Sequence, residues 1–390
     1  MTSTPRTPRP PDSGPESAPS QVLRLRTPGD LLAFLPYQLG YHPRRSVVVV
    51  CWHQRRLGLV QRADLPEDWE VEEALDVLLP VLFREDPSAV TLVGYEDIDG
   101  ESHELLGALA DECVDGDIQV RDQLVVCRGF WRSLACTDPS CCPPGGSRLP
   151  DPAQVPAAVE MVARGVRPAL DRAGLADRLT GTRPLLERAV AAEAEQLQAV
   201  APRPWEATRL VPWRDQALAA WARVLGVAAD AGPDAAVPVA SLPPGDLARA
   251  AVSLVDVEVR DALIAWLTPG NLPFELVDPD LLAQVRRHLS AAGGADDEDR
   301  GRVIEQRLVE LCAALPAAWA VAPLTVLATH SWWRGDGALA RVAVERALAS
   351  DPAYRLAQLL LQMIDHAVRP ERAAAAAESA ARPGPPGTAA

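Results

Sequence analysis

The sequence predicts an α/β domain, with a mixed sheet and flanking helices, followed by an all-helical domain. Two observations carry this prediction. Short valine-rich segments alternate with amphipathic helical periods as far as residue 146, whereas residues 147–370 show leucine and alanine at helical spacing and no convincing strand. With 390 residues the chain is long enough to bury a core in each part.

Both ends of the chain are predicted to be disordered tails. Residues 1–22 are rich in proline, and residues 371–390 run through alanines into an Arg-Pro-Gly-Pro-Pro-Gly sequence. Such compositions offer too little apolar surface to offset the entropy lost when a chain becomes ordered. The domains are therefore expected at 23–146 and 147–370.

The first helix is predicted at residues 27–39. Thr27 is a preferred N-cap, Pro28 suits the first helical position, Asp30 lies in the first turn, and Gly40 can take the left-handed conformation that ends a helix. Its buried side is expected to consist of Leu31, Leu32 and Leu35.

The other elements of the first domain follow from the same alternation. The run of four valines after Ser46 lacks polar residues, which is typical of a strand covered on both faces. The predicted strands are 46–52, 57–62, 89–95, 118–120 and 123–127, and the predicted helices are 71–82 and about 101–113.

Residues 324–368 show the most regular helical pattern. Gly335-Asp336, Ala340, Ala347-Leu348 and Asp351-Pro352 have the spacing of the second half of a tetratricopeptide repeat. The third helix of this pattern has an apolar stripe of Leu356, Leu359, Leu360, Met363 and Ile364. A hairpin of this kind either offers a groove to a partner peptide or packs within its own domain. Because only a single unit is convincing, the second interpretation is favoured.

Charge and composition exclude several classes of protein. The formal net charge is -15, from 53 acidic residues and 38 basic residues, all of them arginine. The absence of lysine excludes chemistry that depends on a lysine amine, such as a P-loop or a Schiff base. Nucleic acid and anionic membranes need a basic surface, so we expect neither as a partner.

The cysteine count indicates a cytoplasmic protein. Seven cysteines in 390 residues are too few for a secreted disulfide framework, and no signal segment opens the chain. Residues 311–333 carry no acidic or arginine side chain, but Pro316 and Pro323 interrupt them. This pattern favours two buried helices over a membrane span.

Three of the cysteines, Cys136, Cys141 and Cys142, fall in one turn-rich segment. Their spacing allows thiolates to share a metal ion, but a closed zinc site needs four ligands and a second pair is missing. The candidates to complete a site are Cys113, Cys127 and His103. Reduced cysteines that pin a buried loop are the favoured interpretation, with zinc binding and a redox-sensing thiol as alternatives. No cofactor other than this zinc is predicted.

An acidic loop follows the predicted strand 89–95. Glu96, Asp97, Asp99 and Glu101 lie where open α/β sheets bind ligands, and carboxylate oxygens suit Mg²⁺. The favoured alternative is an acidic loop that is simply solvated.

A second group of polar residues flanks the predicted strands. Its members are Tyr41, His42, Arg62, Asp64, Arg132 and Ser133. If the strands are neighbours, these side chains converge on a cleft in which His42 is an acid–base group and Arg62 or Arg132 clamps an anion. In the simpler interpretation they satisfy backbone groups at strand ends.

Several of these segments also belong to a pattern that is known as a whole. The pattern consists of Asp30-Leu31-Leu32 through Pro43, Ser46 with its valines, Arg62 to Pro66, Trp131 to Ser133 with Cys136 and Cys141 to Pro143, and Gly335 to Ala338 with Ala347-Leu348. In this order the motifs resemble the uncharacterised actinobacterial family catalogued as domain of unknown function 4192, over roughly residues 23–368. Arg44 and Arg45 stand before Ser46, where the family pattern leads us to expect an acidic or small residue. The resemblance implies no established activity.

We therefore expect a non-enzymatic binding or regulatory protein that binds a protein partner or a small ligand. Catalytic signatures such as His-Glu-x-x-His are absent from the chain. One alternative is an enzyme of the α/β domain that acts on a small anionic substrate through His42, Asp64 and Arg62. A second alternative is a thiol–metal module at the cysteine turn.

Overall fold

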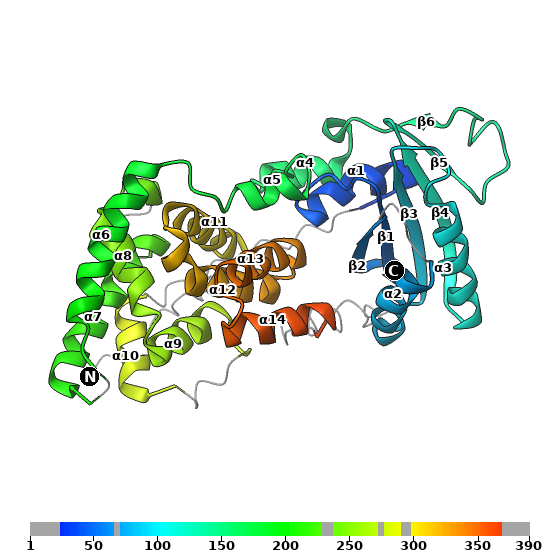
Figure 1. Cartoon of the computed structure of the whole chain (residues 1–390). Coiled ribbons are helices and arrows are strands. Elements are labelled where there is room, and N and C mark those ends of the chain that lie inside the picture. The colour runs from blue at the N-terminus through cyan, green and yellow to red at the C-terminus, as the bar shows by residue number, and fades with distance from the viewer. Residues whose placement is uncertain are drawn as a thin grey trace, which may run out of the picture.

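The computed structural model describes residues 24–65, 71–203, 205–227, 237–271, 277–289 and 298–368. The predicted tails, 1–22 and 371–390, lie outside the described residues. A unit built on a β-sheet lies at one end of the molecule and a helical unit at the other, with the short helices α4 (Pro156–Ala163) and α5 (Arg172–Asp177) between them (Figure 1).

The sheet has six strands in the order β2-β1-β3-β4-β5-β6. The strands are β1 (Ser46–His53), β2 (Arg56–Asp64), β3 (Ala89–Glu96), β4 (Gln119–Cys127), β5 (Phe130–Ser133) and β6 (Ser147–Arg148). Strands β3 and β4 are parallel and the other neighbours are antiparallel, so the sheet is mixed, as predicted.

Two details of the sheet differ from the prediction. The segments 118–120 and 123–127 belong to one strand, β4, because an irregularity in the register at Arg121 absorbs one residue where a break was expected. Strand β6 extends the sheet past the expected boundary at residue 146, since Ser147 and Arg148 pair with β5.

Helices cover both faces of the sheet. Helices α2 (Val71–Glu85) and α3 (His103–Asp115) pack on the face that carries Val47 and Val49. Val48 and Val50 point to the other face and pack with α1 (Pro28–Leu39). The valine run is therefore buried on both sides, which confirms the prediction drawn from its lack of alternation.

Local signals set the ends of α1 as predicted. The amide of Asp30 donates to Thr27 Oγ1 at 3.1 Å, and Gly40 ends the helix with φ of 76°. The expected buried residues Leu31, Leu32 and Leu35 are all buried.

The helical unit follows α5. Its helices are α6 (Pro184–Val200), α7 (Ala207–Leu225), α8 (Pro244–Ser253), α9 (Val257–Leu267), α10 (Pro279–His288), α11 (Glu298–Ala314), α12 (Ala317–Arg334), α13 (Gly337–Ser350) and α14 (Arg355–Asp365). Short 3₁₀ turns occur at η1 (Pro152–Gln154) and η2 (Val239–Ser241). The predicted helical character of this part is confirmed.

The uncharged segment 311–333 is divided between α11 and α12. The break falls at Leu315 and Pro316, whereas Pro323 lies within α12 and does not end it, contrary to the expectation that both prolines interrupt the segment. Among the described residues, no helix is both long and apolar enough to cross a bilayer.

Helices α12, α13 and α14 pack against one another near the C-terminus. Gly335 ends α12 with φ of 91°, and the amide of Leu339 donates to Asp336 Oδ1 at 2.9 Å, as the sequence predicts. The apolar stripe of α14 is narrower than predicted, because Leu359 is 45% exposed while Ala357 and Leu360 are buried. Only one side of α14 packs on the other helices, and Ile364 faces a cleft toward the sheet unit.

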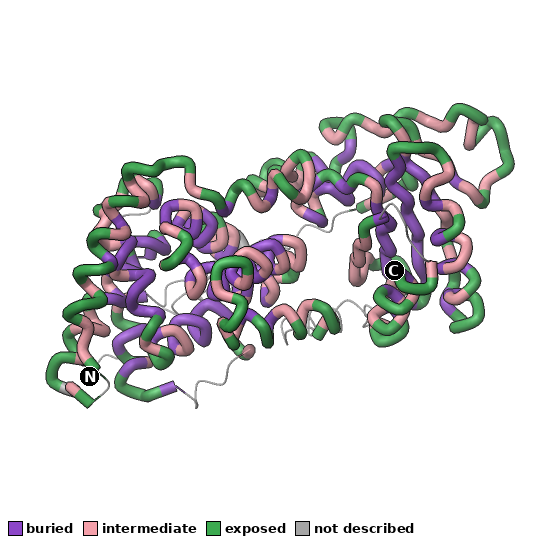
Figure 2. Tube along the Cα trace, in the orientation of Figure 1, coloured by how far each residue is buried: buried purple, intermediate pink, exposed green. Residues whose placement is uncertain are grey.

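The two units share a continuous apolar cluster. Leu31 and Val48 of the sheet unit, Leu175 of α5, and Trp221 and Leu327 of the helical unit all belong to it. Figure 2 shows buried chain both in the sheet and through the centre of the helical unit. The units are therefore joined by packing around α1 and α5.

Candidate functional site

A cleft of about 760 Å³ lies between the sheet unit and the helical unit. Its first wall is the edge strand β2 with residues of α2, and its second wall is the α12–α13 turn with the end of α14. Small residues at that turn, Gly335, Gly337 and Ala338, leave room for the cavity. Beside the cleft, Arg84 of α2 donates to the backbone carbonyl of His366, just after α14.

Arg62 and Tyr41 form the polar centre of the first wall. Tyr41 is 4% exposed, and the guanidinium carbon of Arg62 lies 5.7 Å from the centre of its ring. Arg62 forms an ion pair with Asp64 and donates to the carbonyl of Arg44 at 3.4 Å. Its Nε is buried and has no hydrogen-bond partner among the described residues. Burial raises the pKa of Tyr41, although Arg62 and Arg172 act in the opposite direction.

The second wall carries a chain of ion pairs. Arg172 of α5 binds Glu345 of α13 at 2.7 and 2.8 Å, and Arg341 lies 3.4 Å from the same carboxylate. Arg341 also pairs with Asp365 of α14. All four side chains are between 38% and 43% exposed, so water and small solutes reach them.

The lining of the cleft is more positive than the rest of the chain. Its arginines are Arg56, Arg62, Arg172, Arg334 and Arg341, and its carboxylates are Asp64, Glu345 and Asp365. Five arginines against three carboxylates give an excess of positive charge, whereas the whole chain has a net charge of -15. The local potential therefore favours an anion inside the cleft.

The structure brings together only part of the predicted polar group. Tyr41, Arg62 and Asp64 line the cleft, but His42 is exposed and does not. The amide of His42 donates to the carbonyl of Ala169 at 3.0 Å, and partial burial of its ring lowers its pKa.

The other two members of that group serve different contacts. Arg132 pairs with Asp99 at 2.7 Å and approaches His103 Nε2 at 3.5 Å. Ser133 donates to Asp122 at 2.6 Å and accepts from the amides of Ala135 and Cys136, so it anchors the loop that follows β5.

The acidic loop after β3 is organised around Glu96. This carboxylate is 5% exposed and accepts from the amides of Gly100 and Ser102, at 3.0 and 2.8 Å, and from Ser102 Oγ at 2.6 Å. Asp99 and His103 place a ligand atom within 4.8 Å of it. Through these hydrogen bonds, the Glu96 carboxylate holds the loop after β3 in place.

Asp97, by contrast, pairs with Arg44 at 3.5 Å, and Arg45 binds Glu101 at 2.6 Å. The two arginines that depart from the expected pattern before Ser46 thus hold this loop. Of the predicted acidic group, Asp99 does lie at Glu96, together with His103, whereas Asp97 and Glu101 do not.

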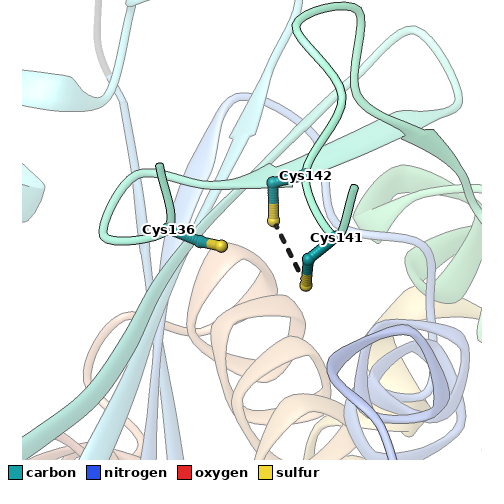
Figure 3. Close-up of side chains that lie close together, drawn as sticks. All are labelled: Cys136, Cys141 and Cys142. Atoms are coloured by element: carbon teal, nitrogen blue, oxygen red, sulfur yellow. Dashed lines mark hydrogen bonds between the residues drawn. The ribbon is translucent and has the colours of Figure 1, made fainter. Parts of the chain in front are cut away.

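The cysteine turn lies at the surface. Cys141 is exposed and Cys136 and Cys142 are half-buried, so the expectation that these cysteines pin a buried loop is wrong. The three Sγ atoms lie within 4.8 Å of one another (Figure 3). A hydrogen bond from the backbone of Asp138 lowers the pKa of Cys136, whereas hydrogen bonding to Cys142 raises the pKa of Cys141 to about 11.

The suggested completing ligands do not join this group. Cys113 lies on the buried side of α3, and burial raises its pKa to about 11. Cys127 contacts the carbonyl of Asp97, and His103 belongs to the Glu96 loop.

A buried carboxylate behind the second wall was not predicted from the sequence. Ser331 Oγ donates to Glu305 Oε2 at 2.9 Å, and Arg334 Nε lies 3.9 Å from that oxygen. Burial, with the negative charge of Asp336, raises the pKa of Glu305 to about 7 against the attraction of Arg334. Helical spacing tells which face of a helix is polar, but it does not tell which carboxylates meet across two helices.

The chain is therefore a two-unit α/β and helical protein, in which a mixed sheet and a set of helices enclose a charged cleft. The model of the family described as "Domain of unknown function (DUF4192)" matches residues 28–371, and the chain belongs to that family. No curated protein and no solved structure matches the chain.

Proposed function

We propose that the protein is a non-enzymatic binding protein of the cytoplasm that holds a small organic anion in the cleft between its two units. The observation that carries this proposal is Arg62, which lies against the buried ring of Tyr41 with an Nε that the protein itself leaves without a hydrogen bond. Arg62 lines the cleft through a guanidinium whose terminal nitrogen binds the exposed Asp64, and an anionic oxygen in the cleft can take the place of that carboxylate.

The size and chemistry of the cleft support a small ligand. Its volume of about 760 Å³ falls within the ordinary range of small-molecule sites. Apolar side chains, including Leu57, Val77 and Ile364, line it beside the arginines. A ligand with an anionic group and an apolar body suits this mixture.

The two walls of the cleft belong to different units, so a ligand that contacts both walls can change how the units are arranged. We infer that the ligand has a regulatory role for this reason. A ligand that contacts Arg62 of β2 and Arg341 of α13 binds best when the two walls are near each other. It therefore favours the conformation in which the units are closed.

The hairpin of α12 and α13 also supports a protein partner as part of this proposal. Its Gly335 turn, the cap at Asp336 and the small Ala340 follow a tetratricopeptide-like pattern. We propose that ligand-dependent closure changes how this hairpin is presented to a partner, rather than that the hairpin forms a groove of its own.

The enzyme hypothesis gains less from the geometry. Arg62 and Asp64 lie in the cleft. His42, the acid–base group of the enzyme hypothesis, is exposed and does not line the cleft. His53 also lines the cleft, but its Nε2 lies 2.8 Å from Glu85 Oε1, so the imidazole is already paired with a carboxylate. Binding is the activity that the arrangement of these residues supports best.

The proposal is tested by calorimetric titration and thermal shift with inorganic pyrophosphate and with citrate, at constant ionic strength. We expect at least one of them to bind, and Arg62→Met to weaken that binding about 10- to 100-fold, the value of one charged hydrogen-bonding group. Arg167→Met is the matched control, because Arg167 is exposed and lies outside the lining. Equal affinity in wild type and Arg62→Met, or an equal loss in both variants, contradicts the proposal.

A further inference from the structure

The exposed loop after β5 gathers three thiols at one point. Cys136 comes from the first part of the loop and Cys141 and Cys142 from the second, and their sulfur atoms lie close together (Figure 3). All three thiols are free, and the Sγ atoms of Cys141 and Cys142 are 4.0 Å apart.

These distances are close to those of a metal–thiolate centre. With Zn–S bonds of about 2.3 Å and tetrahedral angles, two ligand sulfur atoms lie about 3.8 Å apart. The three sulfur atoms are already within 4.8 Å of one another, so small side-chain rotations bring them to that separation.

Hydrogen bonds of the loop backbone hold the thiols in place. The carbonyl of Asp138 accepts from the amides of Cys141 and Cys142, at 3.2 and 2.7 Å. The amide of Cys136 donates to Ser133 Oγ, which in turn donates to Asp122 of β4. Cys136 is thus tied to the sheet through Ser133, and Cys141 and Cys142 are tied to Asp138 within the turn.

We propose that Cys136, Cys141 and Cys142 bind one Zn²⁺ ion as three thiolates, with the fourth position open to water or to an external ligand. Thiolate sulfur prefers zinc to the hard cations Mg²⁺ and Ca²⁺. No carboxylate, imidazole or thiol of another described residue lies in this group of ligand atoms, and Cys141 is exposed, so the fourth position faces solvent. Binding replaces three thiol protons, which pass to solvent, and leaves the site with a single negative charge.

This site is independent of the cleft. None of the three cysteines lines the cleft, so zinc binding and anion binding are separable by mutation. A zinc ion here also stiffens a loop that the protein otherwise holds by hydrogen bonds.

The test uses the full chain purified without chelators, supplied with zinc, and measured by metal analysis. The expected result is one zinc per chain in wild type and loss of stoichiometric zinc in Cys136→Ser, Cys141→Ser and Cys142→Ser. Cys127→Ser is the matched control and keeps its zinc, because Cys127 contacts the carbonyl of Asp97 instead. With cobalt in place of zinc, we expect the thiolate charge-transfer absorption and the intense visible bands of a tetrahedral site.

A thiol titration of wild type makes the proposal falsifiable even if a variant misfolds. The three thiols react with a disulfide reagent in the zinc-free protein and are protected when zinc is added. Zinc that stays bound in the Cys136→Ser, Cys141→Ser, Cys142→Ser triple variant overturns the proposal. So do thiols that remain fully reactive with excess zinc, or a disulfide within the loop in protein purified under reducing conditions.

Discussion

Glu305 is a buried carboxylate whose charge state affects stability. Its folded-state pKa is about 7, raised from 4.5 by burial and by Asp336, so the folded protein holds a proton there that the unfolded chain gives up at lower pH. Its contribution to stability is therefore fully present below about pH 4.5 and is lost as the pH rises through about 7.

The size of the effect follows from the two pKa values. The difference between 4.5 and about 7 corresponds to about 3 kcal/mol. The side chain is 17% exposed, so solvent screens part of this difference and we expect about 2 kcal/mol. Gln at this position is neutral and still accepts from Ser331. Glu305→Gln should therefore raise the free energy of unfolding by about 2 kcal/mol at pH 8 and leave it nearly unchanged at pH 5.

The assay is denaturant unfolding followed by tryptophan fluorescence at pH 5, 6, 7 and 8. Glu195→Gln is the matched control: it removes an exposed carboxylate of α6 that makes no ion pair with the described residues, so its curve should run parallel to wild type. The reasoning is refuted if Glu305→Gln also runs parallel to wild type, or if it is less stable at pH 8.

Two further predictions concern the sheet unit. Gly94→Ala should lower the free energy of unfolding by about 1–3 kcal/mol in denaturant titration, because the new Cβ lies 1.9 Å from Ser102 Oγ, which is bound to Glu96. Gly107→Ala, a helical glycine with nothing within 4 Å, should instead stabilise slightly, and equal losses in both variants contradict the steric argument. Ser133→Ala should weaken zinc affinity about 10-fold in competition with a chromogenic chelator, while Ser133→Thr restores it. Unchanged affinity in Ser133→Ala would show that this anchor does not position Cys136.

The elements set by local chemistry were predictable from sequence. Thr27, Gly40, Gly335 and Asp336 perform the capping roles that their types indicate, because a cap depends on a few neighbouring residues. The lack of alternation after Ser46 likewise revealed a strand buried on both faces.

The errors have local causes as well. The bulge at Arg121 keeps one strand continuous, because strand pairing with β3 outweighs a local polar pair of residues. Pro323 stays within α12, where packing against neighbouring helices outweighs the lost backbone hydrogen bond.

The sequence indicated the residues of one wall of the cleft but not those of the other. Arg62 and Asp64 were selected as strand-end residues, and they do lie in the cleft. Their opposite wall, with Arg172, Glu345 and Arg341, comes from segments far along the chain, and periodicity within one helix carries no information about such a meeting. Exposure of the cysteine loop was missed for the same reason, since local spacing does not tell which side of a turn is covered.

In the proposed site, Arg62 binds an anion, and this anion competes with Asp64 for the guanidinium. The most direct measurement is the affinity for pyrophosphate and for citrate of Arg62→Met and Asp64→Asn, each compared with wild type by calorimetry. We expect opposite effects on affinity: Arg62→Met binds more weakly, and Asp64→Asn binds about threefold more tightly because an exposed competing charge is removed. Loss of binding in both variants, or no change in either, contradicts this expectation.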